Sequence, residues 1–248
     1  LKYSITTIFI TLLGLAGFTA YMLYVPVTIP KEGVVVYVRP GMSRENLVLE
    51  LSQTRLIRFA PLFDLYARIY GVTPRSGEFL VAQGSTPLAI WKQLTKGTGR
   101  YYRSFTIVPG WTFKQVRDAL NNNQMIRHVS ANMSNENIMA ALGDTSHQPE
   151  GMFLPETYYY SRGDVDLVLL KRAHELMSRK LNEAWENRAA NMPYQSAYEA
   201  LIAASLIEKE AYLPQEQPII SGVLVNRLRK NMLLQFDPTV IYGMGDAY

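Results

Sequence analysis

Two carboxylate residues, Glu208 and Glu210, stand at the end of an apolar stretch, a position from which a carboxyl group could do chemistry. The stretch, residues 201–207, reads Leu-Ile-Ala-Ala-Ser-Leu-Ile. Its helix-forming composition, with apolar residues on every face, predicts a helix buried inside a domain. A carboxyl group at the end of such a helix would lose hydration and could keep its proton at neutral pH. A general acid requires such a proton.

Helical geometry separates the two carboxylates. At about 100° per residue, Glu210 lies on the side of Leu206 and Ile207, whereas Glu208 lies near Leu201, roughly opposite. The two therefore cannot both face one substrate. The segment alone leaves two interpretations open: a catalytic carboxyl group, or two solvated residues in a last helical turn. The rarity of buried carboxylates favours the second.

The composition excludes several classes of function. The chain has 248 residues, 48% of them hydrophobic, which is enough for a sizeable core and for more than one domain. It has no Cys, which excludes disulfides, thiolate metal sites and a Cys nucleophile. The formal net charge is +4 and the Lys and Arg residues are scattered, so we expect no nucleic acid partner.

Motifs of other familiar chemistries are missing from the sequence. There is no H-E-x-x-H, and His128, His147 and His174 are isolated, so we expect no metal site. His174 is expected to be an ordinary residue on a helix face. G-x-S-x-G, P-loop and G-x-G-x-x-G motifs are also missing, so we expect neither serine acyl transfer nor any cofactor.

The N-terminal segment predicts a membrane anchor. Residues Ile5 to Val27 contain no charged residue and match the roughly 20 residues that cross a bilayer. Tyr21 and Tyr24 lie at one end, where aromatic residues prefer the interface, and Pro26 then interrupts the helix. A cleaved signal peptide is the alternative, but no A-x-A site follows and the apolar stretch is long. Lys2 is the one preceding charge, so the segment itself barely specifies its orientation.

Three segments share one pattern, in which a short strand is followed by a turn containing Gly, a Ser or Thr helix cap and an amphipathic helix. They cover residues 36–51, 79–94 and 105–120. Gly permits the positive φ of the turn, and the hydroxyl group satisfies the first free N–H groups of the helix. Residues 61–70 predict a further helix that Gly71 closes. Small α+β modules of this kind commonly bind polymers.

The second half of the chain is predicted to be mainly helical. A long helix begins at Asp164 or Asp166 and ends before Pro193, and another covers Gln217 to Lys230. Residues 235–243 are expected to form a turn followed by a short strand. We interpret this half as a second domain.

Carboxylates on a membrane-anchored chain with a polymer-binding module are consistent with cleavage of glycosidic bonds. That reaction needs a neutral carboxylic acid to protonate the leaving oxygen. Most glycosidases add a second carboxylate, for which Glu150, Glu156 and Asp237 are the candidates. Spacing alone does not show whether any of them faces Glu208 or Glu210.

Four motifs resemble those of the YceG-like endolytic murein transglycosylases. They are Glu150-Gly-Met-Phe-Leu-Pro-Glu-Thr-Tyr158, Ala203-Ala-Ser-Leu-Ile-Glu-Lys-Glu210, Val225-Asn-Arg-Leu228 and Leu234-Gln-Phe-Asp-Pro-Thr-Val-Ile-Tyr-Gly243. Their order and spacing agree with the family, as does the N-terminal anchor, and the resemblance covers nearly the whole chain. Each motif alone is weak, but their joint occurrence is highly specific.

The resemblance implies a LysM-like subdomain followed by a domain that cuts nascent glycan strands between N-acetylmuramic acid and N-acetylglucosamine. The family's catalytic acid is the second Glu of I-E-K-E, which is Glu210 here, and the products carry 1,6-anhydro-muramic ends. One carboxyl group can then protonate the glycosidic oxygen and afterwards take the proton of the muramic 6-hydroxyl, so no second catalytic carboxylate is required. The expected substrate-binding or supporting residues are Glu150, Glu156, Asn226, Gln235, Asp237 and Tyr242.

The resemblance also implies a location and partners. We expect a single-pass protein of the cytoplasmic (inner) membrane, with its catalytic domain on the periplasmic, extracytoplasmic side. The expected partners are peptidoglycan strands, the inner membrane and cell-wall synthesis proteins. The main alternative is a non-catalytic, membrane-anchored cell-wall binding or scaffold protein, and a more distant one is a hydrolase that uses water.

Three departures from the family pattern bear on these expectations. Phe236 stands where relatives usually carry a small polar residue, and Glu156 where many have Asp, so the local groove is expected to differ. Family chains continue well past the Tyr-Gly motif, whereas this chain stops at Tyr248, which predicts a catalytic domain truncated at its C-terminus.

The predicted fold class is α+β, with an N-terminal transmembrane helix, a small LysM-like α+β subdomain and a mainly helical α+β catalytic domain. We predict three regions. Residues 1–30 form the anchor and linker, residues 31–148 the LysM-like region with its connector, and residues 149–248 the incomplete catalytic domain.

Overall fold

The computed structural model describes residues 2–71 and 73–244, leaving aside the side chains of residues 2–6 and 8. Helices predominate in these ranges, with two small two-stranded sheets, so the coarse prediction of an α+β fold is confirmed. Contacts divide the chain into two compact units, Leu1–Arg103 and Ser104–Tyr248, which are called unit 1 and unit 2.

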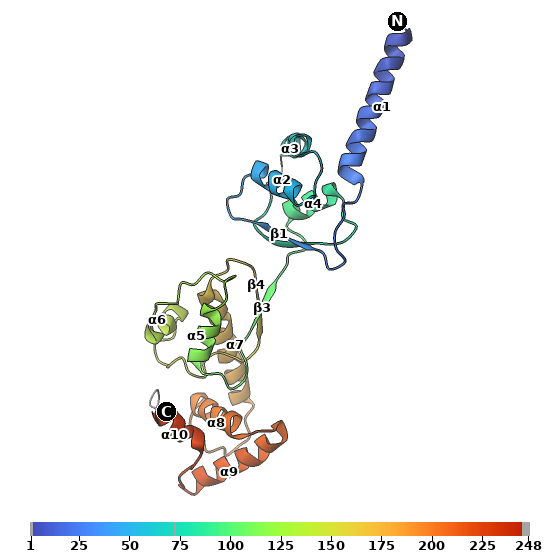
Figure 1. The fold of residues 1–248 in the computed structure, drawn as a ribbon. Coiled ribbons are helices and arrows are strands. Elements are labelled where there is room, and N and C mark those ends of the chain that lie inside the picture. The colour runs from blue at the N-terminus through green and yellow to red at the C-terminus, as the bar shows by residue number, and fades with distance from the viewer. Residues whose placement is uncertain (1, 72, 245–248) are drawn as a thin grey trace. The chain divides into compact units, whose positions relative to one another are not determined.

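Unit 1 is a two-stranded ribbon covered by helices (Figure 1). Its elements are α1 (Lys2–Tyr24), β1 (Val34–Val38), α2 (Arg44–Gln53), α3 (Ala60–Ile69), β2 (Gly77–Val81) and α4 (Pro87–Lys96). The two strands run antiparallel, with Val36 opposite Phe79. Alternation along β2 points Phe79 and Val81 into the core and leaves Leu80 exposed on the other side of the ribbon.

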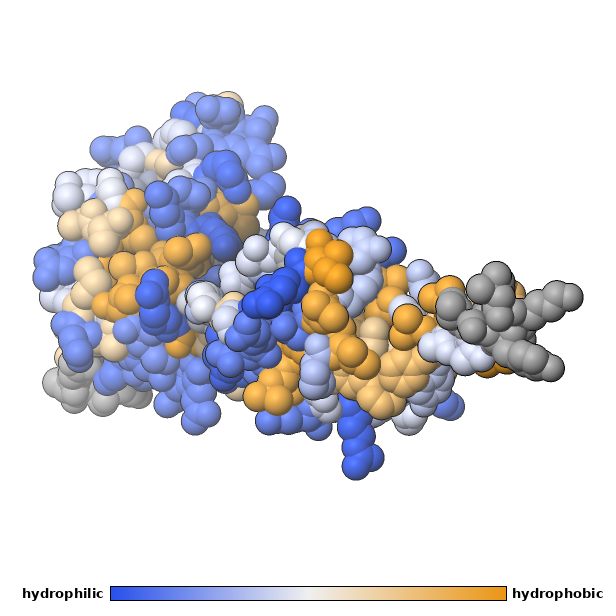
Figure 2. All heavy atoms as spheres, turned by 90° about the horizontal axis from the view of Figure 1, so that it is seen from above, coloured by the Kyte–Doolittle hydropathy of each residue, from blue (hydrophilic) through white to orange (hydrophobic). Residues whose placement is uncertain are grey.

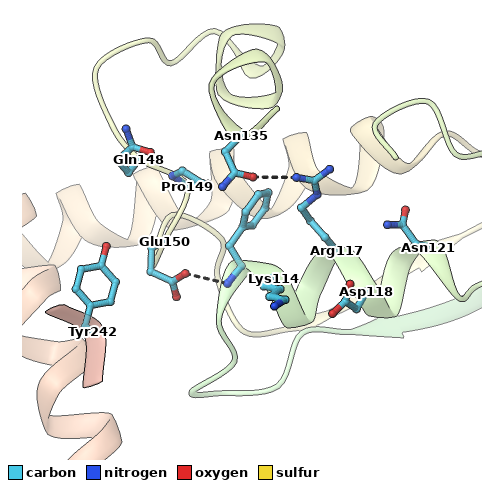
Figure 3. A pocket seen from close by; sticks show the side chains of 10 residues that line it. Lys114, Arg117, Asp118, Asn121, Asn135, Gln148, Pro149, Glu150 and Tyr242 are labelled. Carbon is cyan, nitrogen blue, oxygen red and sulfur yellow. Dashed lines mark hydrogen bonds between the residues drawn. The ribbon is translucent and has the colours of Figure 1, made fainter. Parts of the chain in front are cut away.

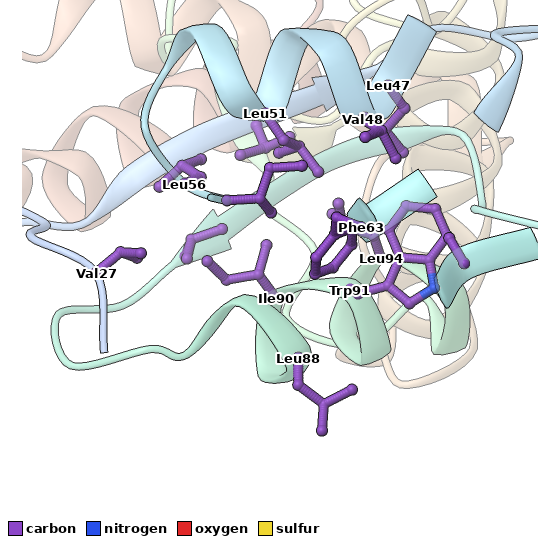
Figure 4. Close-up of a cluster of buried hydrophobic side chains, with 14 of the residues drawn as sticks. Val27, Leu47, Val48, Leu51, Leu56, Phe63, Leu88, Ile90, Trp91 and Leu94 are labelled. Atoms are coloured by element: carbon purple, nitrogen blue, oxygen red, sulfur yellow. The ribbon is translucent and has the colours of Figure 1, made fainter. Parts of the chain in front are cut away.

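One hydrophobic core holds unit 1 together (Figure 4). Leu51 of α2, Phe63 of α3 and Leu94 of α4 are buried in it, and the rings of Phe63 and Trp91 meet edge to face at 5.8 Å. The last turn of α1 belongs to the same core, because Met22 is buried there. The end of α1 is therefore part of unit 1.

The predicted helix caps of unit 1 are confirmed. The Ser43 hydroxyl accepts a hydrogen bond from the Asn46 N–H at 3.2 Å, and the Thr86 hydroxyl accepts one from the Ala89 N–H at 3.2 Å. Each satisfies a free N–H group in the first turn of its helix.

Unit 2 contains a small sheet and most of the helices. Its elements are β3 (Arg103–Thr106), α5 (Phe113–Asn121), α6 (Asn135–Leu142), β4 (Thr157–Tyr160), α7 (Asp166–Glu186), α8 (Ala197–Glu210), the 3-10 helix η1 (Pro214–Glu216), α9 (Gln217–Arg229) and α10 (Asp237–Met244). β3 pairs with β4. The third strand-turn-helix segment, residues 105–120, therefore packs in unit 2, although the predicted regions group it with the first two.

Two hydrophobic cores lie in unit 2. The larger, called the second core, is formed by the sheet, α5, α6 and α7, and includes Phe113, Phe153 and Leu170. The smaller, called the third core, lies between α8, α9 and the segment just before α10, and is centred on Leu224 and Phe236.

The start of α7 depends on a buried carboxylate. Asp166 is the first residue of the helix, as one of the two predicted starts has it, and its side chain has no exposed surface. It accepts hydrogen bonds from the Val129 N–H, the Ser130 N–H and the Ser130 hydroxyl at 2.7–3.1 Å. These bonds tie the segment before α6 to the beginning of α7.

The predicted strand in residues 235–243 is wrong, because this segment forms helix α10. Asp237 lies in the first turn, where a negative charge interacts favourably with the helix dipole, and Pro238 is tolerated there. The Thr239 hydroxyl donates to the Phe236 carbonyl at 2.6 Å, and Phe236 itself is buried. These contacts, together with the burial of Phe236 in the core formed with α8 and α9, outweigh the strand preference of β-branched residues such as Val240.

The predicted anchor, Ile5 to Val27, coincides with most of α1, but the side chains of residues 5, 6 and 8 lie outside the described ones. Among the residues that are described, no helix combines the length and the hydropathy needed to cross a membrane.

Candidate active site

Helix α8 presents the two carboxylates singled out by the sequence. The Ser196 hydroxyl caps its start by accepting from the Glu199 N–H at 3.2 Å. The expectation that the helix is buried on every face is wrong, because Ala203 is its one buried residue in the described structure. Glu208 and Glu210 are both exposed.

The exposure of α8 has a geometric cause. The helix packs with one side, where Leu201 contacts the second core and Leu206 and Ile207 contact the third. Apolar residues on the other side, such as Ile202, remain exposed. An apolar sequence on every face therefore does not require burial on every face.

The two carboxylates differ in their surroundings. Glu208 accepts a hydrogen bond from the Gln217 side-chain amide at 3.2 Å. No hydrogen bond or ion pair joins the Glu210 carboxylate to another residue in the described part of the chain. Glu210 thus keeps both oxygens available to a molecule outside the chain, whereas Glu208 has a partner.

A glycine turn lies against the end of α8. A Cβ atom at Gly110 would stand 3.9 Å from the Lys209 Nζ and 4.0 Å from the Glu208 Cγ. Gly110 has φ of +77°, a conformation that other residues rarely adopt. The turn belongs to the third strand-turn-helix segment, so that segment borders the end of α8 at Glu208.

The Glu150-Gly151 motif lies against the same helix. A Cβ atom at Gly151 would stand 3.8 Å from the Leu201 Cδ2, and the ring of His147 lies 5.0 Å from that of Tyr198. The segment before β4 therefore contacts α8 directly. The first of the four motifs therefore meets the helix that carries the second.

A polar hollow of about 470 Å³ opens beside this segment (Figure 3). Two predicted site residues line it, Glu150 and Tyr242. Figure 3 shows Tyr242 entering from α10 on one side and Lys114 and Arg117 from α5 on the other, with Glu150 between them. The other lining residues are Phe113, Asp118, Asn121, Asn135, Gln148 and Pro149. Amide, carboxylate and cationic groups beside an aromatic ring can bind the hydroxyl and amide groups of a sugar.

Glu150 has a structural role that the sequence did not indicate. Its Oε2 accepts a hydrogen bond from the Phe113 N–H at 3.0 Å, at the first residue of α5. The Thr112 hydroxyl and the Gln115 side chain complete a capping box at the same end. The Glu150 carboxylate therefore stabilises the start of α5, with a second oxygen near the hollow.

The remaining predicted residues are not brought to the hollow. Glu156 is exposed, and its Oε1 accepts from the Thr157 N–H at 2.9 Å. Asn226 is exposed on α9, Gln235 is exposed with φ of +53°, and Asp237 is the exposed first residue of α10. None of these four lines the hollow that contains Glu150 and Tyr242.

The residues that α5 contributes to the hollow were not predicted from the sequence. Lys114, Arg117, Asp118 and Asn121 recur at i, i+3, i+4 and i+7, which is one face of a helix. Arg117 is fixed by donating to the Asn135 side-chain oxygen and to the Met133 carbonyl, each at 2.9 Å. A polar stripe opposite the buried Val116 and Leu120 was the available signal.

A second polar cluster lies behind the loop after α6. The Asp144 carboxylate contacts the His147 Nδ1 at 2.9 Å and the His174 Nε2 at 3.1 Å. Burial raises the pKa of Asp144, but hydrogen bonds from Ser146, His147 and His174 outweigh it and hold the pKa well below its ordinary value. His174 is thus a buried structural residue of α7, and no group of residues suited to a metal ion is found in the described part of the chain.

Comparison with known proteins identifies the family. Residues 36–248 match the model of the YceG-like family, and the chain belongs to that family. An endolytic murein transglycosylase of Bacillus subtilis is 26% identical over 237 residues, which cover 87% of this chain and 64% of the relative. An endolytic murein transglycosylase of Streptococcus pneumoniae is 21% identical over 274 residues, which cover 96% of this chain and 49% of the relative.

This chain therefore spans less than two thirds of the Bacillus relative and about half of the Streptococcus relative. A crystal structure of a YceG-like protein from Listeria monocytogenes has a TM-score of 0.45 and 22% identity, covering 88% of this chain and 77% of that chain.

Proposed function

We propose that this protein is a lytic transglycosylase that cleaves nascent peptidoglycan strands, with Glu210 as its general acid and base. One observation carries the assignment: in a chain of the YceG-like family, the Glu210 carboxylate stands at the end of α8 with no hydrogen-bond or ion-pair partner among the described residues. The relatives named endolytic murein transglycosylases support the reaction type.

The proposed reaction uses one carboxyl group twice. Glu210 donates its proton to the glycosidic oxygen as the bond from muramic C1 to that oxygen breaks. The muramic 6-hydroxyl then attacks C1, and the Glu210 carboxylate takes the hydroxyl proton. A 1,6-anhydro end forms, the acid is regenerated and no water is consumed. A glycan strand lying over the end of α8 would exclude water from the carboxyl group during these steps.

The polar hollow supports a binding role for its lining residues. Tyr242 offers a ring face and a hydroxyl group to a sugar, and Lys114 and Arg117 offer charged donors to the peptide or lactyl carboxylates of muramic acid. Glu150 accepts from bound hydroxyl groups while it caps α5. Glu156, Asn226, Gln235 and Asp237 are proposed as supporting residues only.

The location is proposed from α1. This 23-residue helix contains exposed apolar residues such as Leu13, and the Thr11 and Thr19 hydroxyls donate to carbonyls one turn back at 2.9 and 2.8 Å. Satisfied hydroxyl groups and an apolar surface suit a helix in lipid. We propose that it anchors the protein in the inner membrane, with unit 2 on the extracytoplasmic side. Cell-wall synthesis proteins would then be accessible partners.

A LysM-like role is proposed for unit 1. The order β1-α2-α3-β2, with the strands antiparallel, suits a small glycan-binding module. The competing proposal is a non-catalytic cell-wall binding or scaffold protein. The exposure of Glu210 favours it, since a general acid is commonly shielded from water.

The test compares Glu210→Gln with Glu208→Gln in the purified full-length protein. The amide removes the transferable proton but keeps nearly the same shape, so Glu210→Gln should slow release of anhydro-ended fragments by about 10²–10⁴-fold. Glu208→Gln is the matched control on the same helical turn and should stay near the wild-type rate. Equal losses would reject the choice of Glu210, and an inactive wild type would favour the scaffold protein.

A further inference from the structure

Helix α3 is apolar on two opposite sides. Phe63 and Ala67 are fully buried in the core of unit 1, whereas Leu62, Leu65 and Ile69 are 46%, 53% and 73% exposed. The exposed three recur at i, i+3 and i+7 and so form a stripe facing away from the core. A surface helix ordinarily has polar residues on that side.

Neighbouring residues extend the stripe. Phe59, just before α3, and Tyr70, just after it, are also exposed, and the five residues Phe59, Leu62, Leu65, Ile69 and Tyr70 are called the α3 patch. Single exposed apolar residues are ordinary, but a contiguous patch indicates that something covers it.

The α3 patch is fixed beside the end of α1. The Phe59 ring lies 4.8 Å from that of Phe18 in α1. Arg58 donates to the Val25 and Pro26 carbonyls, both at 2.8 Å, and its guanidinium lies 5.1 Å from the Tyr21 ring centre. These contacts therefore hold the end of α1 and the beginning of α3 together within unit 1.

The figures agree with this arrangement. In Figure 1, α3 lies on the side of unit 1 from which α1 leaves, and it is seen end-on while α1 runs in the plane of the picture. Figure 2 views the molecule from above and shows apolar side chains exposed on this face. Helix α3 thus lies across the direction of α1, as a helix lying on a surface crossed by α1 would.

The charges of α3 suit an anionic lipid surface. Its one acidic residue, Asp64, is paired with Arg44 at 2.7 Å, so the carboxylate is compensated. Arg68, in the last turn, is exposed beside the stripe. Apolar residues flanked by Arg or Lys are characteristic of helices at the membrane interface.

We infer that the α3 patch inserts into the headgroup region of the membrane that α1 crosses, so that unit 1 is held against the lipid surface at two places. The inference rests on the proposed anchor. Two attachments restrict the tilt of unit 1, which a single helix would leave free to swing. The occupant of the patch is therefore a lipid surface.

Site-directed spin labelling of the full-length protein tests the inference, and the absence of Cys from these 248 residues allows a single cysteine to be placed at each chosen position in them. The variants are Leu65→Cys and Ile69→Cys in the patch, Leu13→Cys in α1, and Leu80→Cys on the exposed side of the ribbon. Leu80 is a matched control because it is 40% exposed, close to the 53% of Leu65. Each spin-labelled variant is reconstituted into vesicles of phosphatidylethanolamine and phosphatidylglycerol. The collision rate of the spin label with oxygen, which concentrates in lipid, is then compared with its collision rate with a water-soluble nickel chelate.

We expect the ratio of the two collision rates, oxygen to nickel chelate, to be several-fold higher for labels at positions 65 and 69 than for the label at position 80. It should approach the ratio for the label at position 13. A high, lipid-like ratio at position 13 together with low, water-like ratios at positions 65 and 69 would overturn the inference, while the proposed anchor would remain supported. Protection of the patch from both reagents would also overturn it, since a protein surface then covers α3. Water-like values at Leu13 would reject the anchor and the inference together.

Discussion

The two cores of unit 2 differ in how completely they are built. The second core is enclosed by a sheet and three helices, with Phe113 and Phe153 stacked at 4.8 Å. In the third core, the described residues include just Ala203, Leu224 and Phe236 as buried members. Apolar side chains such as Leu233 and Ile219 remain exposed around it. The proposed acid therefore lies on the thinly packed region, while the well-packed region supplies the platform against which α8 begins.

A similar difference between a rigid region and a less stable region is common in proteins that bind a substrate. Elements that must meet a substrate are drawn from regions of low local stability, and rigid regions position them. Here Tyr198 and Leu201, at the start of α8, contact the second core, whereas Glu210, at its other end, is exposed. We expect opening of α8 to α10 to cost less free energy than unfolding of α5 to α7.

The largest expected effect comes from a matched pair of core substitutions. Phe153 and Phe236 are both 6% exposed, one in the second core and one in the third. Phe153→Ala should lower the free energy of unfolding by about 3–5 kcal/mol, because its cavity lies among closely packed neighbours. Phe236→Ala should cost less than this, because the thin third core can collapse around the gap. Urea denaturation measures both, and equal losses would contradict the proposed difference between the cores.

A smaller effect concerns the acid side of the pH range. In the folded protein the pKa of Asp144 lies well below its ordinary value of 3.8. The hydrogen bonds to its carboxylate therefore stabilise the folded protein above that pH, and this stabilisation is lost as the pH falls through the folded-state pKa. Asp144→Asn should cost about 1–2 kcal/mol near neutral pH. Thermal unfolding at about pH 5 and pH 3 should show a larger loss in the wild type than in the variant. If the wild type and the variant lose the same stability between these two pH values, Asp144 is not the cause of the acid sensitivity.

The smallest effects come from the two helix caps. Thr112→Ala at α5 and Ser196→Ala at α8 each remove one capping bond, worth about 1 kcal/mol. We expect Ser196→Ala to accelerate amide hydrogen exchange in α8 while exchange in α5 stays unchanged. Thr112→Ala should instead lower the stability of the whole second core. If Ser196→Ala accelerates exchange equally in α5 and α8, the two regions open together and the comparison fails.

Much of the fold could be predicted from local signals. The Ser43 and Thr86 caps and the span of α9 follow from side-chain chemistry within a few residues of each position. The helix at residues 237–244 could not be predicted in this way, because the burial of Phe236 against α8 and α9 depends on distant segments.

The candidate site was predicted less completely than the fold. The motif at the end of α8 indicated Glu210. The exposure of Glu210 could not be predicted, because it depends on how few elements pack around α8 and a local sequence pattern carries no information on that. The capping of α5 by Glu150 joins residues 37 positions apart, and the contact of Gly110 with Glu208 joins residues still farther apart. Such pairings depend on tertiary packing, so the sequence could name the residues without showing their partners.

The most direct test of the central claim is to digest peptidoglycan with the full-length protein in heavy-oxygen water and to weigh the products by mass spectrometry. The proposed reaction consumes no water, so the fragments should carry 1,6-anhydro ends without the heavy isotope, and Glu210→Gln should slow their release by about 10²–10⁴-fold. Reducing ends that contain heavy oxygen would contradict the account and identify a hydrolase.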